Sequence, residues 1–86
     1  MESKLKKIFE HYGEEAQVEK LKEEIKELLI EIRLAKALGY GHRDFLEEVA
    51  DVSVMCLQFA LKYPKIQEVM TYKIDRQIDR MKSWEI

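Results

Sequence analysis

The sequence has few of the residues that break or cross-link a chain: its 86 residues include one cysteine, one proline and three glycines. A single cysteine excludes an internal disulfide, so packing alone must hold the fold together. A chain of this length buries only roughly two thirds of its unfolded surface, which leaves a small core. Small proteins without covalent staples often gain stability by oligomerising. We therefore expect a single domain over residues 1–86 that associates with further copies of itself.

The sequence also lacks a strong excess of charge and a long apolar run. It has 15 basic and 17 acidic residues, whereas proteins that follow nucleic-acid phosphates carry a basic excess. The longest mostly apolar run, residues 49–61, is too short to span a membrane. The initial MESKLKKIFE has no apolar core of the kind found in signal peptides. We expect a cytoplasmic protein with no nucleic-acid partner and no membrane partner.

The few glycines and the proline all lie between segments with helical periodicity. No segment alternates apolar and polar residues for long enough to predict a strand. Gly39 is suited to end a helix, and Pro64 is suited to begin one. The expected helices cover residues 5–12, 14–38, 44–63 and 65–84. Short connections between such helices predict an all-α bundle, and we expect oligomerisation to complete it.

The segment 14–38 carries an apolar stripe with alternating spacings of three and four, as in the seam of a helical bundle. The stripe consists of Val18, Leu21, Ile25, Leu28, Ile32 and Ala35. At about 100° per residue, Glu24, Glu27 and Glu31 fall together on one flank of this stripe. Gln17 and Lys20 share that flank, whereas Glu23 points away from the stripe towards solvent.

The next helix repeats this arrangement of acids. Glu48 and Asp51 are three residues apart, and they share a face with Val52, Met55 and Phe59. That face should turn inwards, and Asp51 lies inside the apolar run. An unpaired buried carboxylate is costly, so it is usually protonated, paired or bound to metal. Two facing helices would then present four carboxylates to one point.

Four such charges cannot share a dry site without cations, because like charges raise each other's pKa. Hard oxygen ligands suit Mg²⁺ or Mn²⁺, and Mg²⁺ keeps waters and substrate phosphates in its shell. A bundle core built from inward carboxylates is a known way to hold metal. The alternative is a solvated acidic face with salt bridges, for example between Glu24 and Lys20. Taken together, the two helices favour metal or phosphate chemistry.

The two acidic motifs resemble those of a known family. EEIKE (23–27), followed after 20 residues by EVAD (48–51), matches the EExxE…ExxD pattern of the all-α nucleoside triphosphate pyrophosphohydrolases. These are the MazG-like proteins, with the dimeric dUTPases and the phosphoribosyl-ATP pyrophosphohydrolases as relatives. YGEEAQVEKLKEEIKELL (12–29) resembles the beginning of the first motif helix, and VMTYKIDRQIDRM (69–81) resembles the closing helix.

The resemblance implies Mg²⁺-dependent cleavage of a nucleoside triphosphate between the α and β phosphates, with Mn²⁺ as a possible substitute. The products would be the monophosphate and pyrophosphate, and the substrates would be non-standard or surplus nucleotides. The implied metal ligands are Glu24, Glu27, Glu48 and Asp51. Glu23 would act beside them, for example by orienting a water. A metal-bound water would be the nucleophile, and a carboxylate would accept its proton.

Basic and amide side chains would hold the substrate. Lys73 matches the lysine of the family's closing helix, and Arg76 lies one turn further on. Gln17 and Lys20 could contact base or phosphate. The expected assembly is a homodimer or a homotetramer with sites at subunit interfaces. Two alternatives stay open, namely a phosphoribosyl-ATP pyrophosphohydrolase and a non-catalytic helical module that mediates interactions or binds metal.

Overall fold

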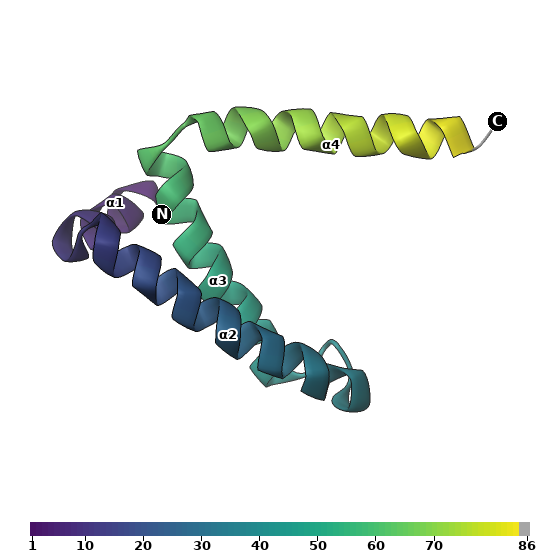
Figure 1. Ribbon diagram of the computed structural model, residues 1–86, viewed down its shortest axis with the longest axis horizontal. Helices are drawn as coiled ribbons and strands as arrows, with labels where there is room; N and C mark the ends of the chain where they lie inside the picture. Colours follow the sequence, from purple (N-terminus) through teal and green to yellow (C-terminus); the bar gives the residue numbers. More distant parts are fainter. Residues whose placement is uncertain (85–86) are drawn as a thin grey trace.

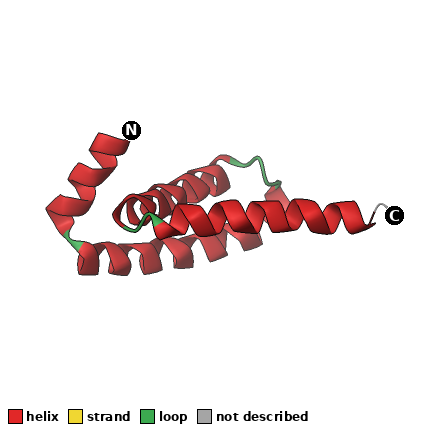
Figure 2. Cartoon of the chain, turned by 90° about the horizontal axis from the view of Figure 1, so that it is seen from above, coloured by secondary structure: helices red, strands yellow, loops and turns green. Residues whose placement is uncertain are grey.

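The computed structural model describes residues 1–84 and shows four helices connected by short turns (Figure 1). These are α1 (Glu2–Tyr12), α2 (Glu14–Leu38), α3 (Arg43–Lys62) and α4 (Lys65–Trp84). No strand occurs in this part of the chain, so the predicted all-helical class is confirmed (Figure 2). The predicted bounds of α2 and α4 are reproduced, whereas α1 begins at Glu2 rather than Leu5. Across residues 1–84 no helix has the length and apolar character needed to cross a membrane.

Two glycines with positive φ connect the first three helices. Gly13 has φ 87° between α1 and α2, and Gly39 has φ 101° after α2. Residues with a Cβ rarely adopt these angles, so glycine is the suitable residue at both positions. The Gly39 N–H donates to the Ala35 carbonyl at 2.7 Å, which ends α2 where the sequence predicts. The sharp turns allow α1, α2 and α3 to pack on one another.

Helices α2 and α3 form a hairpin, and α1 packs against both near the start of α2 (Figure 1). The ring of Phe9 in α1 meets that of Phe59 in α3 edge to face, with centroids 5.3 Å apart. Such aromatic pairs add to the stability that their burial provides. Tyr63 directly follows α3, and its hydroxyl group donates a hydrogen bond to the carboxylate of Glu14 at the start of α2. The end of α3 is therefore tied to both preceding helices.

The face of α2 that packs inside the chain contains four of the six residues of the predicted stripe, together with polar residues of its flank. Its buried and half-buried positions are Gln17, Leu21, Glu24, Leu28, Glu31, Ile32 and Ala35. Val18 and Ile25, which were predicted to be part of the seam, are exposed. The inner face therefore combines the polar flank with four residues of the predicted stripe, and only the edge with Val18 and Ile25 is exposed. Helical periodicity predicts the spacing of a seam but does not fix which flank meets which neighbour.

The apolar run of α3 is also less buried than predicted. Only Met55, Gln58 and Ala60 are buried in this helix, whereas Val54 and Leu57 are exposed. Val54 lines a pocket with Tyr12 of α1, and Leu57 lines another with Leu5 of α1. The apolar run of α3 therefore contributes to open surface as well as to the core.

Helix α4 extends away from the other three helices and packs only against the end of α3 (Figure 1). All its side chains from Lys65 to Lys82 are exposed, including an apolar face of Ile66, Met70, Ile74, Ile78 and Met81. The radius of gyration is 16.0 Å, compared with about 12 Å for a compact chain of this length. The accessible surface of 7208 Å² exceeds by about 1800 Å² that expected for a compact 10.3 kDa monomer.

The turn at Gly13 provides a test of the backbone geometry. Gly13→Ala should lower the free energy of unfolding by about 1–3 kcal/mol, because the φ of 87° is strained for alanine. An added Cβ would meet no atom within 4 Å at Gly13, so the cost is conformational. Gly41→Ala is the matched control, since Gly41 lacks a positive φ and is equally open. Urea unfolding at one protein concentration measures both; equal effects would contradict this account.

Candidate metal centre

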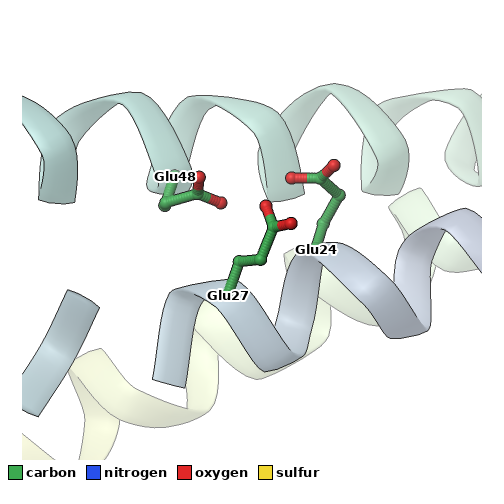
Figure 3. Close-up of side chains that lie close together, drawn as sticks. All are labelled: Glu24, Glu27 and Glu48. Atoms are coloured by element: carbon green, nitrogen blue, oxygen red, sulfur yellow. The ribbon is translucent and has the colours of Figure 1, made fainter. Parts of the chain in front are cut away.

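Three carboxylates converge between α2 and α3 (Figure 3). Glu24 and Glu27 are one turn apart on the face of α2 that meets α3, and Glu48 lies opposite them in α3. One oxygen atom from each of the three lies within 4.8 Å of those from the other two. The predicted convergence of acids from two helices is therefore present for these three residues.

The cluster is partly withdrawn from water. Glu24 is only 6% exposed, and Glu48 is half-buried. The Oε2 atoms of Glu24 and Glu48 are both buried and have no hydrogen-bond partner in the described part of the chain. A buried oxygen atom without a hydrogen-bond partner costs stability, and the cost is greater when the group is charged than when it is neutral. The metal-free cluster is therefore short of positive charge or donors.

Lys20 supplies part of the missing positive charge. Its Nζ lies 3.1 Å from Glu24 Oε1 and 3.8 Å from Glu23 Oε2. The bond to Glu24, followed by the charge of Glu23, raises the pKa of Lys20. This is the salt bridge that a solvated acidic face would contain. It pairs with Glu24 Oε1 and leaves the buried Oε2 atom without a donor.

Glu48 carries the strongest electrostatic effect of the cluster. Removal from water, followed by the negative charges of Glu27, Glu24 and Asp51 and by a hydrogen bond with Glu24, raises the pKa of Glu48 to about 7. Near neutral pH, a substantial fraction of this carboxyl group is therefore protonated in the metal-free protein. Groups with such shifted pKa values occur often at functional sites, because the environment that shifts them is costly to build.

The other predicted acids lie beside the cluster rather than within it. Asp51 is exposed and does not belong to the group of converging oxygens, although its charge acts on Glu48. Its expected burial is wrong: Ala50 before it is exposed, and Val52 after it is only half-buried. Glu23 points to solvent as predicted and contacts Lys20. The structure thus brings together three of the four predicted ligands.

The predicted substrate-binding residues lie in two separate places. Gln17 is buried between α2 and α3, where its Nε2 donates to Gln58 Oε1 at 2.7 Å. Lys20 adjoins the cluster, whereas Lys73 and Arg76 are exposed on α4, which packs only against the end of α3. The sequence prediction did not include Gln58 among the site residues. Its signal is a single amide in an apolar run, on the same face as Met55.

The residues present fit a hard divalent cation. Mg²⁺ and Mn²⁺ prefer carboxylate oxygens, and Mg²⁺ binds through a few carboxylates while keeping several waters. Glu24, Glu27 and Glu48 offer carboxylate oxygens, two of which are buried and unpartnered. A cation bound there would remove both the repulsion among the acids and the lack of donors.

Comparison with known proteins finds no matching family model, no matching curated protein and no matching solved structure. The resemblance to the MazG-like family therefore stays a prediction that rests on the motifs in residues 12–81.

The raised pKa of Glu48 predicts how stability depends on pH. Between the usual glutamate pKa and about 7, the folded state binds more protons than the unfolded state. The metal-free protein should therefore lose stability as pH rises through this window. With Mg²⁺ the trend should weaken or reverse, because cation binding requires the ionised carboxylates.

Thermal unfolding with chelator and with Mg²⁺, from about pH 5 to pH 8, tests this prediction. Glu48→Gln should remove the contribution of Glu48 to the pH dependence. Glu47→Gln is the matched control, because Glu47 is exposed and pairs with Arg43 away from the cluster. Identical pH profiles for wild type and Glu48→Gln would show that Glu48 has an ordinary pKa.

Proposed function

We propose that this protein is a Mg²⁺-dependent nucleoside triphosphate pyrophosphohydrolase with a MazG-like fold. It would cleave between the α and β phosphates and release pyrophosphate, with non-standard or surplus nucleotides as its substrates. The observation that carries this proposal is the convergence of Glu24, Glu27 and Glu48 with two buried, unpartnered oxygen atoms. A cluster that lacks positive charge suits a substrate that arrives with metal ions on its phosphates.

Each acid has a role in this proposal. Glu24, Glu27 and Glu48 would hold the cation, and the exposed Asp51 beside them would be the fourth ligand. A bound Mg²⁺ would supply Lewis-acid chemistry to the phosphates and to water. Binding would require Glu48 in its ionised form, which would link assembly of the centre to pH. Glu23, outside the cluster, orients a water or supports Lys20.

Lys20 changes its partner in this proposal. In the metal-free chain its ammonium group lies 3.1 Å from Glu24 Oε1. A bound cation would supply positive charge to Glu24, so Lys20 would be released to contact a phosphate oxygen. Its side chain is about half exposed, which leaves room for this movement.

We further propose that the active form is at least a homodimer. The excess surface of about 1800 Å² per chain would bring a dimer interface into the range of obligate assemblies. The apolar face of α4 and the exposed apolar edge of α2 provide that surface. Lys73 and Arg76 lie on α4, away from the carboxylate cluster of their own chain. In the dimer they would contact substrate phosphates at the cluster of the partner subunit.

The activity test is release of pyrophosphate from a panel of standard and modified nucleoside triphosphates and phosphoribosyl-ATP, with Mg²⁺, Mn²⁺ or chelator. We expect metal-dependent release that falls at least about a hundredfold in Glu24→Gln, Glu48→Gln and Asp51→Asn, because each loses a ligand charge. Glu23→Gln should lose less, since Glu23 lies outside the converging group. The panel also separates a nucleotide house-cleaning enzyme from a phosphoribosyl-ATP pyrophosphohydrolase.

The outcomes of this test differ for each alternative. A folded protein that binds Mn²⁺ but releases no pyrophosphate from any substrate would be a metal-binding module. A protein that neither binds Mn²⁺ nor responds to Glu48→Gln would be a helical interaction module. Equal losses in Glu23→Gln and Glu24→Gln would contradict the assignment of the metal ligands.

The dimer proposal has its own test. Ile74→Lys combined with Ile78→Lys places charges on the exposed apolar face of α4 and should shift the protein to a smaller species. Asp79→Lys changes charge on another side of the same helix and should leave the assembly intact. Light scattering after size-exclusion chromatography measures the mass; a wild-type monomer would refute the proposal.

A further inference from the structure

A pocket of about 480 Å³ lies between α1, α2 and α3, next to the metal centre. Tyr12 and Ala16 line it from the junction of α1 and α2, and Met55 lines it from α3. Its volume falls in the range of small-molecule sites, which are mostly apolar with a few converging polar groups. The pocket belongs to one chain and needs no residue from α4.

The polar groups of the pocket form a buried amide pair. Gln17 and Gln58, which are 4% and 2% exposed, both line it. Gln17 Nε2 donates to Gln58 Oε1 at 2.7 Å, and Gln58 Nε2 lies 3.7 Å from Met55 Sδ. These contacts use one N–H of each amide. A second N–H on each residue and the Gln17 carbonyl oxygen are therefore available for a ligand, and together they offer donors and an acceptor.

Lys20 connects the pocket with the metal centre. It lines the pocket, and its Nζ lies 3.1 Å from Glu24 Oε1. Gln17, Lys20 and Glu24 occupy successive turns on one face of α2, and Gln17 and Glu24 are about 10 Å apart along the helix axis. An extended nucleotide spans such a distance between its base and its phosphate chain. Lys20 therefore lies between the amide pair and the cluster along one face of α2.

We propose that this pocket binds the nucleobase and sugar of the triphosphate, with the base edge hydrogen-bonded to the Gln17–Gln58 amide pair. This assignment rests on the proposed function, because the phosphates must lie at the Glu24–Glu27–Glu48 cluster. A base has apolar faces and a polar edge. The faces match Tyr12 and Met55, and the edge matches the amides, since buried amides left unpaired would reject a ligand without such an edge. Lys20 would lie between sugar and phosphates.

The test fills the pocket without changing the metal centre. Ala16→Phe places a ring in the pocket from an exposed position of α2, where the fold tolerates a larger side chain. Ala37→Phe is the matched control, because Ala37 is exposed on the same helix away from the pocket. Tyr12→Ser removes an aromatic side chain that lines the pocket. It is a second test that stays informative if Ala16→Phe fails to fold.

Four quantities are measured for each variant: the KM of the preferred nucleoside triphosphate, the Ki of tripolyphosphate, Mn²⁺ binding and the mass of the assembly. Ala16→Phe and Tyr12→Ser should raise KM by about tenfold or more, as expected when contacts to a base are lost. The tripolyphosphate Ki, Mn²⁺ binding and mass should stay as in wild type, because these depend on the cluster and the interface. Ala37→Phe should change none of the four.

The outcomes separate this inference from the proposed function. Pyrophosphate release by wild type, with KM unchanged in both pocket variants, would overturn the base pocket alone. Parallel loss of tripolyphosphate and nucleotide binding would also overturn it, because the substitutions would then act through the metal centre. A changed mass of the assembly in the pocket variants would also overturn the base pocket, since the pocket would then hold part of a partner subunit. Absence of both Mn²⁺ binding and release in wild type would overturn the proposed function itself.

Discussion

The charge gathered where α2 meets α3 is the constraint that this hairpin must accommodate. Glu24, Glu27 and Glu48 share that interface, and two of their oxygen atoms are buried without a hydrogen-bond partner. Lys20 offsets part of the negative charge, and a proton on Glu48 offsets more, because the pKa of Glu48 is raised to about 7. The ammonium group of Lys20 and the proton on Glu48 each supply one positive charge, whereas a divalent cation would supply two. The interaction that costs the metal-free hairpin stability is thus the one that makes it a candidate metal centre.

The rotation of α2 about its own axis decides both which residues form this centre and which apolar residues stay exposed. Because the flank with Gln17 and Glu24 faces α3, polar groups occupy positions that the core of an ordinary helical hairpin would fill with apolar ones. The apolar edge with Val18 and Ile25 is left facing away from the chain. The interface within the chain therefore combines apolar packing with a polar cluster, and apolar side chains such as Val18 and Ile25 stay exposed.

The sequence predicts those features that depend on local spacing. Glycine, proline and the 3.6-residue period predict where the helices begin and end. The rotation of about 100° per residue predicts that Glu24 and Glu27 share one face of α2. Burial is different, because it depends on what covers a side chain. Asp51 was wrongly expected to be buried, since apolar neighbours in sequence do not guarantee a cover. Gln58 was missed because its partner, Gln17, is 41 positions away and only the tertiary fold brings the two amides together.

The direction of α4 completes the argument for more than one chain. Two residues separate α3 from α4, and the Tyr63 hydroxyl holds this connection to Glu14 while Gln67 Nε2 donates to the Ala60 carbonyl at 3.3 Å. These bonds direct α4 away from the hairpin (Figure 1). Helix α4, which carries Lys73, packs only against α3, so it lies apart from the carboxylates of its own chain. Under the proposed function a triphosphate needs positive charge beyond Lys20, and a metal ion and the Lys73 of a second copy would supply it.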